Sequence, residues 1–234
     1  MPSEPAERLV EGATAGLAVF DLDGTLTWRD TLRPFLLGYL RRRPARILRL
    51  WRAPAYLLAY LLGGADRGAL KARLIRMVLG GRSRPEIDRW ADEFTASLAA
   101  RGAFRPAALA CLRRHRDAGD RLVLLSASPD LYVPRIGASL GFDETICTGV
   151  RWSGEQLDGS LSTANRRGEE KVRCLVALRQ RHPGLRVTAY GNSGSDLPHL
   201  RLAERALLVN ASHRARASAR SLGVTVGEFE NFGA

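Results

Sequence analysis

The chain has 234 residues, of which 45% are hydrophobic, and a formal net charge of +12. This length allows one substantial domain, or a core domain with a small insertion, and the balance of apolar and charged residues excludes a disordered chain. Lys71 and Lys171 are the only lysines among 36 basic residues, a bias typical of GC-rich coding. The charge is therefore no indication of nucleic-acid binding, and we expect no such partner. A basic surface still attracts phosphate esters and acidic lipid headgroups.

The cysteines and histidines show no spacing that indicates a metal site. Cys111, Cys147 and Cys174 lie far apart, so we expect neither a zinc site nor disulfides, and a reducing compartment such as the cytoplasm. The N-terminal residues lack the basic start and long apolar stretch of a signal peptide. Residues 53–62 form the longest apolar run, which is well short of the roughly 20 residues that cross a bilayer. We expect the four histidines on the surface: His115, His182, His199 and His213.

The first predicted element is a buried strand over residues 17–20, directly before Asp21. The pattern over residues 31–116 is helical, with apolar residues at helical spacing between Leu70 and Leu79. Ser83 and Glu86 have the spacing of a capping box, which predicts that a helix begins there. We interpret this region as an inserted helical unit.

The remaining chain alternates strands with helices. Strands are predicted at 121–125, 187–190 and 206–209, helices at 129–140 and 168–181, and a hairpin within 145–162. Such alternation is typical of a parallel α/β sheet with Rossmann-like topology. Parallel sheets bind ligands at the carboxyl ends of their strands, where Asp21, Ser126 and Asn192 fall.

Asp21 and Asp23 follow the first strand in the segment Phe-Asp-Leu-Asp-Gly-Thr. Carboxylates at i and i+2 beyond a strand end can both be directed at one site. Phosphoryl transfer needs an in-line nucleophile, which Asp21 could be, and a proton donor and acceptor, which Asp23 could be. A magnesium ion would let the carboxylate approach an anionic phosphate. The alternative is that Asp-Gly-Thr is only a solvated turn.

Four motifs occur in order along the chain, each in a fitting strand or helix context. They are Asp21-Leu-Asp23-Gly-Thr, Leu-Leu-Ser126-Ala-Ser-Pro, Gly-Glu-Glu-Lys171 and Gly-Asn192-Ser-Gly-Ser-Asp196. With these motifs, nearly the whole chain resembles the phosphatases of the haloacid dehalogenase superfamily. The resemblance implies a magnesium-dependent phosphomonoester hydrolase that works through an aspartyl-phosphate, and it makes the turn interpretation unattractive.

The resemblance also implies a role for each motif residue. Asp21 and Asp23 would be the catalytic pair, and together with Asn192 they would hold Mg²⁺. The Ser126 hydroxyl, the backbone N–H of Ala127 and the Lys171 ammonium would bind the phosphoryl group. Asp196 would orient Lys171 or metal-bound water. The alternative for Lys171 is a lysine on a helix surface.

Asn192 departs from the superfamily pattern, which usually has an aspartate ligand at this position. An amide oxygen can still coordinate magnesium, but one negative charge is lost. We therefore expect weaker magnesium affinity rather than inactivity.

The helical insertion resembles the C1 cap of the phosphoserine phosphatase-like branch, which divides the chain into core residues 1–28, a cap over 29–105 and core residues 106–234. Asp30 stands nine residues after Asp21, where those phosphatases usually have a glutamate that binds the substrate amine. Asp30 is therefore a candidate substrate contact. Lys71 is another, although we interpret it first as a surface residue.

The start of the insertion is basic and then apolar, with eight arginines between Arg29 and Arg52 followed by residues 53–62. This composition resembles phosphatidylglycerophosphatase C and suits peripheral contact with an anionic membrane, at its inner face. A buried cap helix with arginines on its solvated face explains it equally well. Three alternatives stay open: a lipid phosphate such as phosphatidylglycerophosphate, a soluble ester such as phosphoserine or another amino-acid-derived phosphate, or a non-catalytic phospho-ligand binder.

Overall fold

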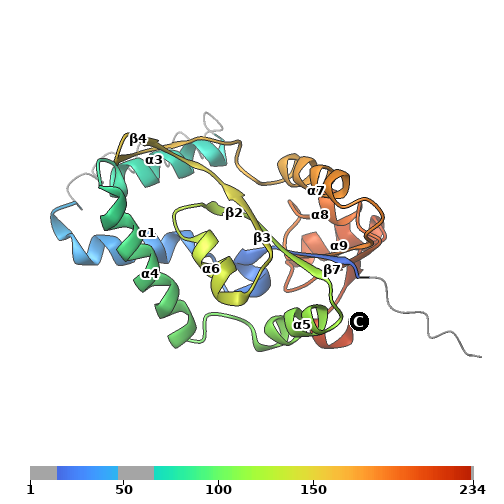
Figure 1. Cartoon of the computed structure of the whole chain (residues 1–234). Helices are drawn as coiled ribbons and strands as arrows, with labels where there is room; N and C mark the ends of the chain where they lie inside the picture. The colour runs from blue at the N-terminus through green and yellow to red at the C-terminus, as the bar shows by residue number, and fades with distance from the viewer. Residues whose placement is uncertain (1–14, 47–65, 233–234) are drawn as a thin grey trace, which may run out of the picture.

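A parallel sheet of six strands lies at the centre of the computed structural model, which describes residues 15–46 and 66–232 (Figure 1). The strand order is β3-β2-β1-β6-β7-β8, so β1 is central and the chain crosses from one half of the sheet to the other. The strands are β1 (Leu17–Phe20), β2 (Arg121–Pro129), β3 (Glu144–Thr148), β6 (Val187–Gly191), β7 (Arg205–Leu208) and β8 (Thr225–Val226).

Helices cover both faces of this sheet, because the central strand is apolar on both sides. Leu17 and Val19 belong to one buried cluster, with residues of α7, α8 and α9, whereas Ala18 and Phe20 belong to another, with residues of α5 and α6. These layers confirm the predicted α/β class with a parallel sheet. The helices are α5 (Pro106–Asp117), α6 (Val133–Leu140), α7 (Glu169–Arg181), α8 (Leu197–Leu200) and α9 (His213–Ser221), with a short helical turn at Phe229–Asn231.

Three further helices lie to one side of the sheet: α1 (Leu32–Arg42), α3 (Arg67–Leu79) and α4 (Arg84–Ala100) (Figure 1). Their aromatic residues pack together, with Phe35 between Trp90, Phe94 and Tyr132 at ring-centroid distances of 5.7, 5.1 and 4.5 Å. Tyr132 precedes α6 of the sheet layer, so this aromatic cluster joins the helical unit to the core.

A two-stranded hairpin, β4 (Val150–Ser153) and β5 (Gln156–Leu161), packs against α3 rather than joining the main sheet. Backbone hydrogen bonds connect it to the turn between α3 and α4: Gly81 N donates to Leu157 O at 2.8 Å, and Leu157 N donates to Arg82 O at 2.9 Å. The helical insertion is thus completed by a segment from the second half of the chain, which the predicted all-helical unit did not include.

Two local predictions were wrong. The strand predicted over 121–125 continues to Pro129 because it keeps pairing with β3, where Pro129 lies opposite Thr148, and the next helix therefore begins at Val133 instead of at 129. Helix α4 does begin after Ser83, but the Ser83 side chain makes no capping hydrogen bond. Glu86 instead accepts a hydrogen bond from the Tyr39 hydroxyl at 2.7 Å.

The predicted surface position is also wrong for two of the four histidines. His115 is buried and contacts Tyr190, with 2.6 Å between Nε2 and the hydroxyl oxygen. His199 is 1% exposed, within α8. Both lie on helices packed against the sheet, and spacing in the sequence carries no signal for such packing.

No helix of the described residues is long and apolar enough to cross a membrane. Of the predicted basic and apolar segment, the apolar residues 53–62 and two of the eight arginines fall within residues 47–65, outside the described part of the chain.

The register of the sheet brings the motif residues to one edge. Phe20 lies beside Leu124 of β2 and beside Tyr190 of β6. Asp21 therefore emerges at the carboxyl end of β1, between the second half of β2, which continues to Pro129, and the carboxyl end of β6.

Candidate active site

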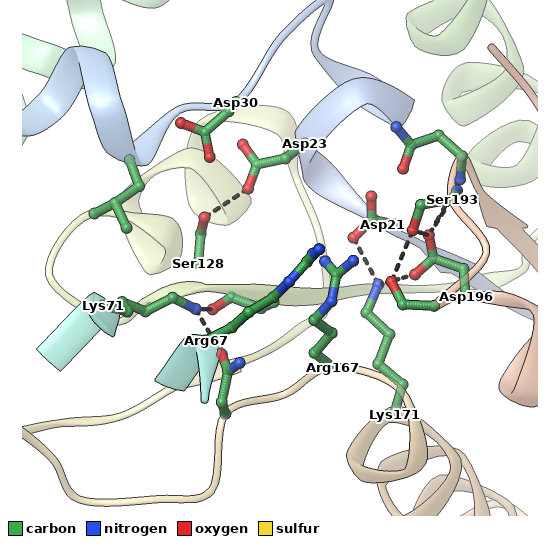
Figure 2. Close-up of a pocket in the computed structure, with 15 residues that line it drawn as sticks. Asp21, Asp23, Asp30, Arg67, Lys71, Ser128, Arg167, Lys171, Ser193 and Asp196 are labelled. Carbon is green, nitrogen blue, oxygen red and sulfur yellow. Dashed lines mark hydrogen bonds and ion pairs between the residues drawn. The ribbon is translucent and has the colours of Figure 1, made fainter. Parts of the chain in front are cut away.

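A cavity of about 170 Å³ opens at this edge of the sheet (Figure 2). Core strands, α3 and the loop before α7 all contribute residues to it. Of the predicted site residues, it is lined by Asp21, Asp23, Asp30, Lys71, Ala127, Lys171, Asn192 and Asp196.

Lys171 holds two carboxylates at the centre of the site. Its Nζ donates to Asp21 Oδ1 at 2.6 Å and to Asp196 Oδ1 at 2.7 Å (Figure 2). All three side chains are buried, with Lys171 only 2% exposed, so the interpretation of Lys171 as a surface lysine is wrong. The second oxygen of Asp21, Oδ2, accepts a hydrogen bond from the Thr25 hydroxyl at 3.0 Å.

Burial and charge act in opposite directions on these groups. Burial lowers the pKa of Lys171, but the carboxylates of Asp196 and Asp21 outweigh it and raise that pKa above its ordinary value. Burial raises the pKa of Asp21 to about 7, although Lys171 counteracts it. The pKa of Asp196 is lowered, because Lys171 overcomes the effect of burial. The Lys171 ammonium thus keeps Asp196 ionised, but it offsets the effect of burial on the pKa of Asp21 only in part.

Asp23 is held by three donors. Thr31 donates from both its backbone N–H and its hydroxyl to Asp23 Oδ1, each at 2.7 Å, and the Ser128 hydroxyl donates to Oδ2 at 2.5 Å. Thr31 directly precedes α1 and its hydroxyl lies 2.9 Å from the Tyr132 hydroxyl, so the helical unit helps to position this carboxylate. Burial raises the pKa of Asp23, and the neighbouring Asp30 adds to this effect.

Asn192 lies against the turn that carries Asp23. Gly24 has φ +83°, and a Cβ there would lie 2.0 Å from Asn192 Nδ2, so only glycine allows this close approach. Asp196 Oδ2 accepts hydrogen bonds from Asn192 N at 3.3 Å and from Ser193 N at 3.0 Å, which orients the loop.

A magnesium ion suits the donors that line this cavity. Among the residues described, no three histidine, cysteine, aspartate or glutamate side chains form a group that could hold a metal. The predicted set instead combines oxygen atoms of Asp21 and Asp23 with the Asn192 amide oxygen, and all are hard oxygen donors of the kind that Mg²⁺ prefers.

The last residues of β2, after Leu125, include the predicted phosphate-binding groups. Ser126 is fully buried, and its Oγ accepts a hydrogen bond from Ser128 N at 3.0 Å. Ala127 and Ser128 line the cavity, whereas Ser126 does not. The Ser126 side chain therefore orders the end of β2, which presents Ala127 and Ser128 to the cavity.

The cap candidates both reach the cavity. Lys71, from α3, donates to Ala127 O at 2.5 Å and to Asn165 Oδ1 at 2.6 Å, so its interpretation as a surface residue is wrong. Asp30 is exposed and lines the cavity, and its Oδ2 accepts a hydrogen bond from Arg33 N at 2.9 Å.

Several lining residues were not predicted from the sequence. Ser128 carried a signal, because it belongs to the same Ser126-Ala-Ser-Pro motif as two predicted phosphate-binding residues. The arginines carried none, since 34 of the 36 basic residues are arginine. The residues missed are Leu32, Arg67, Ser128, Asn165, Arg167, Ser193 and Ser195.

The fold and this site define a hydrolase of the haloacid dehalogenase type. The family model of haloacid dehalogenase-like hydrolases matches residues 18–201, and the chain belongs to this family. This confirms the predicted enzyme at the level of the hydrolase family.

Comparison with known proteins gives a curated relative and structures of the same fold. Protein CicA of Caulobacter vibrioides (strain NA1000 / CB15N) is 36% identical over 191 residues, covering 80% of this chain and 83% of CicA. A Bordetella pertussis Tohama I protein of unknown function has a TM-score of 0.77 at 24% identity, covering 92% of this chain and 99% of that one. A probable phosphoserine phosphatase from Vibrio cholerae has a TM-score of 0.71 at 14% identity, covering 93% of this chain and 61% of that one.

Proposed function

We propose that this protein is a magnesium-dependent phosphomonoester hydrolase that forms an aspartyl-phosphate on Asp21. The observation that carries the proposal is the Lys171 ammonium, which contacts both Asp21 and Asp196 in the cavity that Asp23 also lines. This arrangement combines a nucleophile, a proton-transfer group and a cation for the phosphoryl oxygens. The fold shared with a probable phosphoserine phosphatase is consistent with it.

The reaction takes place in two steps. A carboxylate oxygen of Asp21 attacks phosphorus while the bond from phosphorus to the alcohol oxygen breaks, and protonated Asp23 gives its proton to that oxygen. Asp23 then takes a proton from water, whose oxygen attacks the phosphorus, so that inorganic phosphate leaves and Asp21 is regenerated. Lys171 and the N–H group of Ala127 stabilise the phosphoryl oxygens. When bound by Asp21, Asp23 and Asn192, Mg²⁺ would reduce the repulsion between carboxylate and phosphate.

The substrate class has two candidates. A lipid phosphate such as phosphatidylglycerophosphate is one, and the basic composition between Arg29 and Arg52 would favour peripheral contact with anionic lipid. A soluble ester such as phosphoserine is the other, and the small size of the cavity favours it. Binding to liposomes that depends on anionic lipid and falls with added salt would support the first candidate.

The nucleophile is tested with Asp21→Asn, which removes the attacking carboxylate. Esters to assay with Mg²⁺ are phosphoserine, glycerol 3-phosphate and phosphatidylglycerophosphate in mixed micelles. We expect kcat to fall at least about a thousandfold. Acid quenching should trap a phosphoryl adduct, detected by intact mass, on the wild-type chain but not on the variant.

The matched control is Asp117→Asn, because Asp117 is an exposed aspartate at the end of α5, away from the cavity. Full activity of Asp21→Asn would refute the proposed nucleophile. Failure of the wild-type protein to hydrolyse any ester, together with binding of a phosphorylated ligand, would identify a non-catalytic binder instead.

A further inference from the structure

A chain of hydroxyl groups leads from the aromatic cluster to Asp23, the proposed proton donor and acceptor. The Tyr132 hydroxyl lies 2.9 Å from the Thr31 hydroxyl, which donates to Asp23 Oδ1 at 2.7 Å. On the other side of the carboxylate, the Ser128 hydroxyl donates to Oδ2 at 2.5 Å (Figure 2). Each oxygen of Asp23 therefore has a hydroxyl donor, and the donor to Oδ1 is in contact with Tyr132.

Tyr132 places a polar group at the end of an otherwise apolar ring. The residue is fully buried, and its ring packs against Phe35 and Phe94 at centroid distances of 4.5 and 5.4 Å. Burial raises the pKa of Tyr132 well above its ordinary value, so the hydroxyl keeps its proton. A buried O–H group without an acceptor is costly, and the Thr31 hydroxyl, which is also buried, provides one.

Counting donors and acceptors gives this chain a direction. A hydroxyl has one proton to donate, and an ionised carboxylate only accepts. When Asp23 is ionised, the Thr31 proton points at Oδ1, so the Tyr132 proton points at Thr31. If protonated Asp23 instead donated to Thr31, Thr31 would have to donate to Tyr132, and the Tyr132 proton would lose its acceptor. Burial of Tyr132 therefore opposes this reversal.

The direction of these hydrogen bonds matters for the first step of the proposed reaction. Asp23 then gives its proton to the alcohol oxygen, so the proton must point into the cavity that Asp23 lines. A proton donated to Thr31 would be held by the protein instead. With Thr31 and Ser128 both acting as donors, the carboxyl group carries its own proton on the side of the substrate.

We propose that Tyr132 is a positioning residue for Asp23. Its hydroxyl donates to Thr31, fixes Thr31 as a donor to Asp23 Oδ1, and thereby keeps the acid proton directed at the leaving alcohol. Tyr132 acts through Thr31 and does not touch the substrate. This inference rests on the proposed phosphatase function and adds to it a residue that lies outside the four sequence motifs.

Tyr132→Phe tests the proposal, because it removes the hydroxyl and keeps the ring in the aromatic cluster. Alkyl esters such as glycerol 3-phosphate and phosphoserine need a proton on the leaving oxygen, whereas p-nitrophenolate leaves without one. For the better of the two alkyl esters, we expect kcat/KM with Mg²⁺ to fall at least about tenfold, but for p-nitrophenyl phosphate less than about threefold. Because kcat/KM covers the steps up to the aspartyl-phosphate, its later hydrolysis does not affect the comparison.

Tyr39→Phe is the matched control. Tyr39 is also a buried tyrosine of the aromatic cluster, packed against Trp90, and its hydroxyl donates to Glu86 at 2.7 Å. Neither Tyr39 nor Glu86 lines the cavity. The control should keep the wild-type ratio of kcat/KM between the alkyl ester and p-nitrophenyl phosphate. Circular dichroism and thermal unfolding check that every variant is folded.

Thr31 provides a second, independent measurement. Thr31→Val removes the hydroxyl through which Tyr132 would act and should lower the same ratio, whereas Thr31→Ser keeps a hydroxyl and should retain most of it. Adding Tyr132→Phe to Thr31→Val should cause little further loss, because both changes break the same chain. If Tyr132→Phe does not fold, equal ratios in the valine and serine variants of Thr31 would still refute the proposal.

The negative results distinguish the positioning role from the proposed function. If Tyr132→Phe lowers kcat/KM equally for both kinds of ester, or lowers neither, the positioning role is refuted while the phosphatase stands. The same holds if the losses from Tyr132→Phe and Thr31→Val add in full. If the wild-type protein hydrolyses no ester, the proposed function itself fails, and the role of Tyr132 fails with it.

Discussion

At the scale of single residues, the site depends on Lys171 and its surroundings. A buried ammonium that contacts two buried carboxylates leaves uncompensated charge whenever one partner is lost, and such losses typically cost about 3–5 kcal/mol of folding free energy. His199 is also buried, with 1% of its surface exposed, and the nearby charge of Lys171 adds to the effect of burial in lowering its pKa. Within the described part of the chain, Nδ1 of His199 has no hydrogen-bond partner.

His199 should make stability depend on pH. Burial, with Lys171 contributing, lowers its pKa from 6.5 to about 3. Below pH 6.5 the unfolded chain therefore binds a proton that the folded chain does not, so stability is lost as pH falls from about 6.5 toward 3. At about pH 4.5 the loss from this group is about 2–3 kcal/mol relative to pH 7.5.

Urea unfolding of the wild-type protein and of His199→Gln at both pH values measures this loss. Glutamine stays neutral, so the variant should lose about 2–3 kcal/mol less between the two pH values. The difference between the proteins isolates His199 from the carboxylates, which titrate in both. Equal losses would contradict the assignment.

At the scale of elements, the hairpin β4–β5 supports the helix that presents Arg67 and Lys71. Gly159 has φ +89°, and a Cβ there would lie 2.7 Å from Cα and 2.8 Å from N of Arg76, on α3. Arg76 also forms an ion pair with Asp158 at 2.8 Å, but this pair is too exposed to contribute much to the stability of the fold. The close backbone approach is therefore the feature that a side chain would disturb.

Gly159→Ala should destabilise the protein and weaken the site. Left-handed backbone at alanine costs roughly 1–2 kcal/mol, and the clash with α3 adds about 1–3 kcal/mol. Gly154→Ala is the matched control, because Gly154 also has positive φ, +56°, but nothing lies within 4 Å of its Cβ position. Urea unfolding should show the larger loss for Gly159→Ala, with a lower kcat/KM, and equal losses in both variants would refute the packing argument.

At the scale of the whole molecule, the site joins the strand ends to the helical unit, so magnesium binding should stabilise the fold. A ligand at about 100 times its Kd adds about 2.7 kcal/mol to the folded state. For a chain of this size, each kcal/mol raises Tm by about 2–4 °C. We expect Mg²⁺ to raise the Tm of the wild-type protein by several degrees and EDTA to reverse this effect.

Asn192→Asp should strengthen this response. The added carboxylate brings one more negative charge to the cation, but it repels Asp21 and Asp23 when no cation is bound. The variant should have a lower Tm in EDTA and reach half of its magnesium-induced stabilisation at a lower Mg²⁺ concentration, measured by thermal titration. An unchanged half-saturation point would contradict the weak-ligand role of Asn192.

The sequence alone determined the parallel α/β class, the order of its strands along the chain, and the strand-end residues of the site. Asp21, Asp23 and Asn192 were predicted because short apolar runs end in polar motifs, and parallel strands bring their carboxyl ends to one edge. Lys171, which lies on α7, and Asp196 were predicted from the resemblance to the haloacid dehalogenase phosphatases. Apolar runs and the motifs that follow them are local patterns in the sequence, so they can be recognised without a structure.

Only the tertiary structure decided which residues complete the cavity opposite the strand ends. Arg67 and Lys71 on α3, and Arg167 on a distant loop, meet there because the β4–β5 hairpin folds back onto α3. In a chain where 34 of 36 basic residues are arginine, no local pattern separates these arginines from those on the surface. For the same reason, the sequence wrongly predicted surface positions for Lys71 and the two buried histidines. Their positions depend on contacts between segments far apart in the sequence.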